Sequence, residues 1–280
     1  MRMIRQPIGW RQQVLLGAAA LLLVVIVYGW LSHRQHVKNP TDKTMPNLSQ
    51  FVEGWKRMCL PKAGKEAWTW KDLWPPSSRV WLVQDAWATY GRLVIGMVVG
   101  VLSALVVGVA MGCFARVESV FLPVLNFFAK IPPTAMLAVY FIVFGVNFKM
   151  YVAMVALGIA PTLTQSIYQA AKKDVTEHAI FKAYTLGASH METIWNVVCR
   201  QILPRAIENT RLQVGMAMVF LIAAEMLTAE VGFGYQLRMQ MRLQNMNVVY
   251  SYLIILGATG LLIDWGFSSG RRRLCRWFGD

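Results

Sequence analysis

Six long apolar stretches constrain the fold of this chain more than any other feature. Each approaches or exceeds the roughly 18 apolar residues that a helix needs to cross the hydrocarbon core of a bilayer. The composition agrees, since 56% of the 280 residues are hydrophobic and only 15% are charged. The sequence therefore predicts an all-α integral membrane protein with about six transmembrane helices, at Val14–Leu31, Leu93–Phe114, Val120–Val146, Met150–Tyr168, Leu212–Ala229 and Val248–Gly266.

The chain has a formal net charge of +14, and the positions of its basic residues along the sequence indicate the cause. A strongly basic chain suggests nucleic-acid binding, but here the Arg and Lys residues gather where apolar stretches end. Cytoplasmic loops of membrane proteins are enriched in Lys and Arg in this way. We therefore expect a membrane environment and no nucleic-acid partner, with both termini and the polar segment 172–204 in the cytoplasm. The basic groups are Arg2, Arg5 and Arg11; Arg116; Lys172, Lys173, Lys182, Arg200 and Arg205; and Arg271, Arg272, Arg273 and Arg276.

The first apolar stretch follows arginines and so is similar to a secretory signal peptide. Residues 28–33 offer no convincing cleavage site, however, and the apolar run is long for a signal core. We interpret it as a retained first span, which divides the chain into three parts. Residues 1–31 form an N-terminal cytoplasmic tail and first transmembrane helix, and 32–88 an external Trp-rich segment. Residues 89–280 form a core with five transmembrane helices and a cytoplasmic loop at 172–205. The Trp-rich segment is either an interfacial belt or a surface for an external partner.

Small residues and prolines mark special positions within the predicted spans. Glycines and other small residues at spacings of three or four let membrane helices pack closely. Proline has no N–H and a fixed φ, so it favours a helix start or a kink. We expect close packing of the second span, a helix start or kink at Pro132-Pro133, and a kink at Pro161. The small residues are Gly96, Gly100, Ser103, Ala104, Gly108 and Gly112.

A polar segment, 172–204, interrupts the membrane spans. Its sequence predicts a short helix that begins near Asp174 and Glu177 and ends at Gly187. Ser189 followed by Glu192 matches a capping box, which predicts a second helix. That helix is amphipathic, with Ile194, Val197, Val198 and Ile202 on one stripe. Two short helices on a cytoplasmic face indicate a docking surface for a soluble partner.

Several motifs, in order, resemble those of a known family. Leu186-Gly187-Ala188-Ser189, preceded by Ala183 and followed by Leu203-Pro204, resembles the cytoplasmic EAA loop of ABC importer permeases. The surroundings resemble the nitrate/sulfonate/taurine-type branch, and the resemblance covers residues 89–277. Two positions depart from the loop signature, because Phe181 and Lys182 stand where it has an acidic residue and an alanine. The supporting motifs are Thr89-Tyr90-Gly91-Arg92-Leu93, Lys130-Ile131-Pro132-Pro133, Phe144-Gly145, Ala224-Glu225-Met226-Leu227 and Gly232-Phe233-Gly234-Tyr235.

The resemblance implies a type I ABC importer permease in the bacterial inner membrane. Such a subunit works as a dimer, here either a homodimer or a pair with a related permease. It receives solute from an extracytoplasmic binding protein and is driven by a cytoplasmic ABC ATPase. This chain has no phosphate loop, so we expect ATP and Mg on the partner ATPase and no cofactor on the chain. The residues expected to couple to the ATPase are Glu177, Phe181, Lys182, Ala183, Tyr184, Thr185, Gly187, Ala188, Ser189 and Pro204.

Ionisable residues in or near the spans are candidates for function, because a charge in the bilayer is costly. We expect Lys130, Pro132, Pro133, Glu225 and Arg92 to line the translocation pathway or its gate. Two alternatives remain open. Lys130 can extend its charge toward an interface, and Glu225 can serve as a structural partner of Arg92.

Three classes of function fit a membrane protein of this kind. The first is the permease subunit of an ATP-driven importer of a small, anionic solute of the nitrate, sulfonate, taurine or bicarbonate type. The alternatives are an ion-coupled secondary carrier and a membrane-embedded enzyme. A carrier predicts more buried carboxylates and no docking loop. Against an enzyme, the sequence holds no GxSxG or HExxH motif and no Cys/His cluster for a metal.

Overall fold

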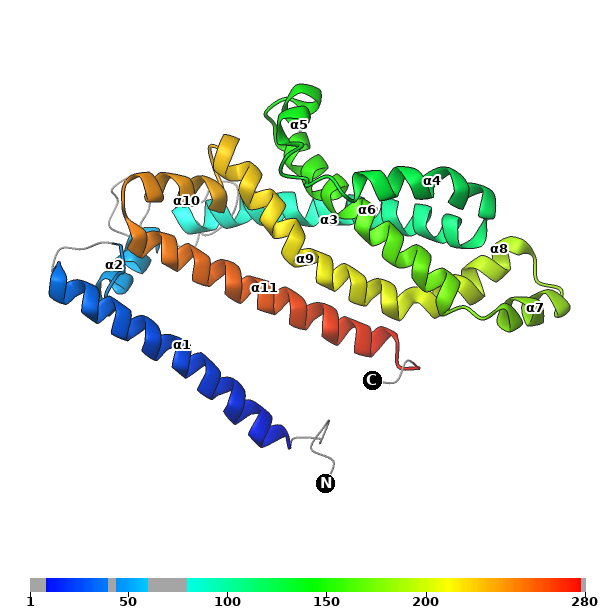
Figure 1. Ribbon diagram of the computed structural model, residues 1–280, viewed down its shortest axis with the longest axis horizontal. Helices are drawn as coiled ribbons and strands as arrows, with labels where there is room; N and C mark the ends of the chain where they lie inside the picture. The colour runs from blue at the N-terminus through cyan, green and yellow to red at the C-terminus, as the bar shows by residue number, and fades with distance from the viewer. Residues whose placement is uncertain (1–8, 40–43, 60–79, 278–280) are drawn as a thin grey trace. The chain divides into compact units, whose positions relative to one another are not determined.

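The computed structural model describes residues 9–39, 44–59 and 80–277, and these residues fold into helices (Figure 1). The predicted all-α fold is therefore confirmed. The Trp-rich part of the predicted external segment falls largely on residues 60–79, outside the described residues, and the predicted division of the chain into three parts stays a prediction. In chain order the helices are α1 (Trp10–Lys38), α2 (Leu48–Cys59), α3 (Trp81–Cys113), α4 (Ala115–Phe128), α5 (Leu137–Phe144), α6 (Phe148–Lys173), α7 (Glu177–Thr185), α8 (His190–Thr193), the π-helix η2 (Ile194–Cys199), α9 (Arg200–Thr228), α10 (Phe233–Arg242) and α11 (Met246–Leu274).

Five helical segments of the described chain are long and apolar enough to cross a bilayer. They are α1, α3, α6, the continuous run from α8 through η2 to α9, and α11. Each contains all or nearly all of one predicted apolar stretch. Hydropathy thus located these spans correctly.

The remaining stretch, Val120–Val146, does not form one continuous helix, so the expectation of a single span there is corrected. α4 ends at Phe128 and α5 begins at Leu137, with turns between them. Pro132 and Pro133 have no N–H to donate, and a proline disfavours helical geometry at the residue before it. The sequence predicts a helix start or kink at the proline pair, whereas the structure has a full break there that separates two helices.

The chain forms two compact units. The first joins the described residues of 1–60 with 240–251. In it, the rings of Tyr28, Phe51 and Tyr250 meet edge to face or tilted, with centroids 5.9 to 6.1 Å apart. Gly54 of α2 lies against the backbone of Asn247, where an added Cβ would be 2.8 Å from the carbonyl oxygen. α1 is held near its C-terminal end, and its apolar side chains before Tyr28 are exposed, as lipid-facing residues are.

The second unit is built on a close pair of parallel helices, α3 and α6. Small residues of α3 face α6 at every fourth position: Gly96 meets Val155, Gly100 meets Ile159 and Gly108 meets Ile167. The offset between partners is constant and both numbers rise together, so the two helices run in the same direction. Glycine lacks a Cβ, which lets the backbones approach until van der Waals contact is made along the whole seam. The predicted close packing of this span is confirmed.

α9 packs antiparallel to α6 in the same unit. Tyr151 near the start of α6 bonds Thr228 at the end of α9, and Asp174 just after α6 pairs with Arg205 near the start of α9. Figure 1 shows α7 beyond one end of these helices and α10 near the other. We call these the α7 end and the α10 end of the unit. Buried apolar residues of α3, α6 and α9 fill the space between the two ends.

Because α3 and α6 are parallel, the segment between them must run back along the unit. α3 finishes at the α7 end and α6 starts at the α10 end, so residues 114–147 must return along the unit. α4 has 14 residues and α5 has 8, which is about 33 Å of helix in total. Together they make the return as two half-helices with a break between them.

Candidate functional sites: the α7 hairpin and the helix-break cavity

α7 ends in a motif that fixes the turn after it. Gly187 has φ of +83°, the left-handed region that residues with a Cβ rarely adopt. Its N–H bonds the carbonyl of Tyr184 at 2.9 Å, and the next N–H, of Ala188, bonds the carbonyl of Ala183 at 3.1 Å. This pair of bonds is a Schellman motif, which satisfies the last carbonyls of the helix. The helix end predicted at Gly187 is confirmed.

The next helix begins with the predicted capping box. The Glu192 N–H bonds the Ser189 hydroxyl at 3.3 Å, and the Ser189 N–H bonds the Glu192 carboxylate at 2.8 Å. The start of the second helix is therefore set by local sequence. It continues without interruption through α8 and η2 into the span α9. Val198 and Ile202 of this run are buried in one apolar cluster with Leu163 and Ile167 of α6, so the run is packed against the spans.

The hairpin exposes an unusual number of large apolar side chains. Phe181 is 60% exposed, Leu186 87% and Trp195 71%, and no residue of α7 is buried. We define the α7 face as the exposed apolar side chains of Phe181 and Tyr184 on α7 and of Leu186 just after it. Trp195 lines a separate groove with Leu105 and Val106 of α3. Of the residues predicted to couple to an ATPase, Glu177, Phe181, Lys182, Tyr184, Thr185, Gly187 and Ser189 are exposed, Ala183 and Ala188 half-buried, and Pro204 buried within α9.

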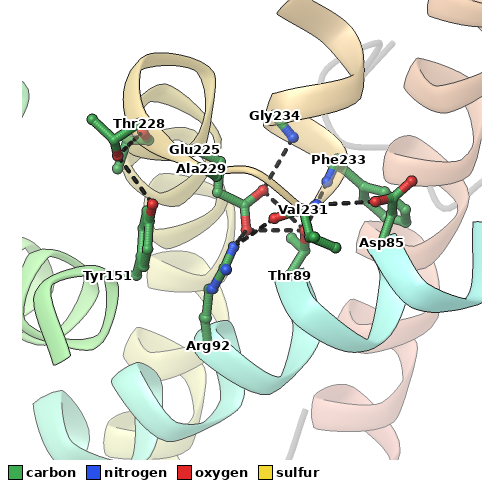
Figure 2. A network of polar contacts seen from close by, with 12 residues as sticks. Asp85, Thr89, Arg92, Tyr151, Glu225, Thr228, Ala229, Val231, Phe233 and Gly234 are labelled. Carbon is green, nitrogen blue, oxygen red and sulfur yellow. Dashed lines mark hydrogen bonds and ion pairs between the residues drawn. The ribbon is translucent and has the colours of Figure 1, made fainter. Parts of the chain in front are cut away.

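Glu225 is fully buried at the α10 end, in the network drawn in Figure 2. Its carboxylate accepts from Arg92 Nη1 at 2.7 Å and from the Thr89 hydroxyl at 2.9 and 3.1 Å. It also accepts from the Gly234 N–H at 3.0 Å, where α10 begins. A buried carboxylate is tolerated only when paired and hydrogen-bonded, and both conditions are met here. The pairing with Arg92, one of the two alternatives for Glu225, is present.

A second carboxylate, Asp85 of α3, extends this network to α11. Asp85 accepts from the Gly232 N–H at 3.0 Å and from the Tyr252 hydroxyl of α11 at 3.0 Å. The N–H of Phe233, which lies between Gly232 and Gly234 in the chain, bonds Thr89 Oγ1 at 2.9 Å. Three successive N–H groups at the start of α10 are therefore held by side chains of α3 and α9. Sequence reasoning missed Asp85; its only signal is its place one helical turn before Thr89 on α3.

Arg238 of α10 is also engaged within the fold. It donates to the carbonyls of Leu227 and Ala229 at 2.8 and 3.2 Å. These carbonyls lie at the C-terminal end of α9, where a helix lacks internal partners and carries partial negative charge. The Arg238 guanidinium thus stabilises the connection between α9 and α10.

A cavity of about 630 Å³ opens at the break between α4 and α5. Of the residues predicted to line the pathway or its gate, Lys130, Pro132 and Pro133 line this cavity. Arg92 and Glu225 lie in the network at the α10 end. Their role in a pathway stays a prediction. The opposite walls come from α6 and α9, and Gly158 lets Phe220 approach, since a Cβ there would lie 2.7 Å from the ring. The lining residues are Leu125, Phe128, Ala129, Lys130, Ile131, Pro132, Pro133, Met136, Tyr140, Leu157, Gly158, Ala160, Pro161, Thr162, Gln213, Met216 and Phe220.

Comparison with known proteins decides the family. Residues 96–273 match the model of the family described as binding-protein-dependent transport system inner membrane component. The chain belongs to this family. The match covers more than half of the chain, including both the α7 hairpin and the cavity.

Two curated relatives of this permease have names that specify transport. It is 25% identical over 276 residues to the taurine transport system permease protein TauC of Escherichia coli K12, covering 99% of this chain and 94% of TauC. It is 24% identical over 186 residues to the putative aliphatic sulfonates transport permease protein SsuC of Bacillus subtilis 168, covering 66% and 67%. The permease is therefore a transport subunit of the inner membrane and not an enzyme.

The fold agrees with a solved transporter. An inward-facing structure of the MetNI methionine ABC transporter matches 69% of this chain and 95% of its own chain, with a TM-score of 0.63 and 18% identity. This likeness shows the fold, that of a type I importer permease. Permeases of such importers work in general with an ATPase and a binding protein.

Proposed function

We propose that this permease imports a small anionic solute of the nitrate, sulfonate, taurine or bicarbonate type. A binding protein delivers the solute at the α10 end, and a separate ATPase, which binds ATP and Mg, drives the cycle from the α7 end. The α7 end is thus cytoplasmic, as are both termini, and the working unit is a dimer of permeases. The names of TauC and SsuC support the solute class, and the basic residues near the α7 end support the orientation.

The exposed α7 face is the observation that carries this proposal. Apolar side chains exposed on a short helix beyond the end of the spans indicate a protein contact. A Schellman motif ends α7 and a capping box starts α8. The turn between the two helices is therefore already ordered and loses little conformational entropy on docking. Phe181 replaces the acidic residue of the family signature, so the contact is expected to depend on apolar burial at that position.

The route from the hairpin to the membrane is short. α8, η2 and α9 are one uninterrupted helical run from His190 to Thr228. Movement of the hairpin is therefore passed to a span directly, as in rigid-body domain switching. η2 is a π-helical segment, and such insertions lengthen one turn and often occur at functional positions.

We assign the predicted pathway residues to two places. Lys130, Pro132 and Pro133 belong to the solute pathway, because they line a cavity between the half-helices and the spans α6 and α9. Arg92 and Glu225 hold the turn before α10 and so maintain the shape of the α10 end.

ATPase binding tests the proposal. The variant Gly187→Val should lose co-purification of the cognate ATPase and ATP-driven uptake, because valine is strained at φ of +83°. Gly266→Val is the matched control, since Gly266 lies in α11 with open space around it and should retain ATPase binding. Phe181→Ser should weaken ATPase binding without changing the fold. Uptake that continues in vesicles lacking any ATPase would instead establish a secondary carrier.

A further inference from the structure

The helix break lies at the middle of the spans. An added Cβ at Gly158 would lie 3.4 Å from Pro133 and 2.7 Å from Phe220. Gly158 stands close to the centre of α6, which has 26 residues and is about 39 Å long. The hydrocarbon core is about 30 Å thick, so the break is roughly 15 Å from either interface.

Non-helical backbone at this depth has a specific implication. In lipid, backbone polar groups must be satisfied within the protein, so irregular segments occur only where they are covered by protein or line a water-filled cavity. Residues 129–136 are such a segment, and most of them line the cavity at the break. The cavity is therefore expected to hold water.

Among the described residues that line this cavity, Lys130 is the one that carries a charge, and none is Asp or Glu. Within the described part of the chain, no carboxylate lies within 4.0 Å of its ammonium. The neutral polar groups of the lining are Tyr140, Thr162 and Gln213. A positively charged side chain thus lines a space whose other walls are apolar or neutral polar.

Two structural roles for Lys130 are too weak to account for its position. A cation just past the end of α4 gains about 0.3 to 1 kcal/mol from the helix dipole, whereas a lysine at the bilayer centre costs about 2.5 to 3.5 kcal/mol. Extension to the interface is excluded by distance, since about 15 Å is well beyond the reach of a four-carbon stem. Water in the cavity and an anionic ligand remain as the means of offsetting the free-energy cost of the Lys130 charge.

We propose that Lys130 is the charge-selecting residue of the pathway, attracting the anionic group of the solute to the helix break. The inference rests on the proposed function for the identity of the cavity as a pathway. It goes beyond it by assigning anion preference to one side chain of the permease, in addition to any selection by the binding protein. Arginine should replace Lys130 in this role, and glutamine should not.

Thiol chemistry in the cavity tests this without knowledge of the solute. The four native cysteines are changed to alanine, and Thr162→Cys places a thiol of similar size on the α6 wall. The full-length permease, in complex with its ATPase in lipid nanodiscs, is treated with a methanethiosulfonate carrying a sulfonate group or one carrying a trimethylammonium group. The measured quantity is the modification rate with the anionic reagent divided by the rate with the cationic reagent. This ratio is normalised to the same ratio at Ser49→Cys, which is exposed on α2.

With Lys130 or Lys130→Arg, the normalised ratio should favour the anionic reagent, and with Lys130→Gln it should fall by about fivefold or more. A ratio unchanged by Lys130→Gln overturns the proposal, because the charge then does not act on the cavity. Failure of both reagents to modify the thiol introduced by Thr162→Cys overturns it too, because the cavity is then closed to water. Neither result bears on ATPase docking, which the Gly187 variant tests. If glutamine prevents assembly, Lys130→Met, a second neutral variant, provides the same comparison.

Discussion

Arg92 Nη1 lies 2.7 Å from Glu225 Oε1, and the same guanidinium stands over the ring of Tyr151 at 4.2 Å. One cation of α3 thereby connects α9 and α6 at the α10 end of the second unit. Glu225 is 0% exposed, so its charge depends on partners within the protein.

The Arg92→Ala variant should lose about 3 to 5 kcal/mol of stability, because it leaves the buried Glu225 carboxylate without its cation. The double variant Arg92→Met, Glu225→Met should recover part of this loss. Thermal unfolding of the purified permease, followed by tryptophan fluorescence, measures both. The exposed pair of Arg57 and Glu53, with N and O 2.6 Å apart, is the control, and Glu53→Ala should change stability by less than about 1 kcal/mol. Equal losses at the two pairs would contradict the buried network.

Gly232→Ala should destabilise the turn before α10 for two independent reasons. The residue has φ of +130°, and a Cβ would lie 2.8 Å from the Glu225 carboxyl group. The expected loss is at least about 1 to 3 kcal/mol, the usual cost of strained backbone. Gly257→Ala in α11 has open space and should be neutral or slightly stabilising. The midpoint of thermal unfolding separates the two variants, and a neutral Gly232→Ala would refute the packing described for this turn.

The α3–α6 seam predicts a compensating pair of substitutions. A Cβ at Gly100 would lie 2.8 Å from the Ile159 side chain and 3.1 Å from the Ala156 backbone. Gly100→Ala should therefore cost about 1 to 3 kcal/mol through overpacking. Adding Ile159→Ala, which removes the nearest atoms, should cost less than the sum of the two single losses. A double-variant cycle of unfolding midpoints tests this, and strict additivity would place the two residues out of contact.

Glu118, which precedes the apolar stretch of α4, should make stability pH-dependent. Its hydrogen bond from Lys172, at 2.6 Å, is the main cause that holds the pKa of Glu118 below its ordinary value of 4.5, and a bond from Tyr168 adds to it. A lowered folded-state pKa stabilises the protein above the unfolded value, and this stabilisation is lost as pH falls through the folded-state value.

The difference in unfolding midpoint between the native chain and Glu118→Gln should accordingly be present at pH 7 and shrink below about pH 4.5. Measurements from pH 7 to pH 3.5 in the same detergent provide the comparison. A difference that grows on acidification would mean that the carboxyl group is not stabilised in its charged form.

Local signals in the sequence determined the spans, the helix break and the α7 hairpin. Hydropathy locates a helix in a bilayer, Pro132-Pro133 removes the N–H groups that a continuous helix needs, and Gly187 and Ser189 terminate and start helices through their own backbone and hydroxyl groups. Each of these features depends on residues within a few positions of one another, so the sequence by itself contains the cause.

Only the tertiary structure decided which helices meet. Lipid is as apolar as a buried leucine, so hydrophobicity does not tell which face of a span packs on protein. The parallel seam of α3 and α6, the place of Lys130 opposite the centre of α6, and the convergence of Asp85, Thr89 and Arg92 on the turn before α10 all depend on that choice. The sequence identified Glu225 as a carboxylate within a span, where it requires polar partners. The fold provides these partners, which are a backbone N–H, a hydroxyl and a cation.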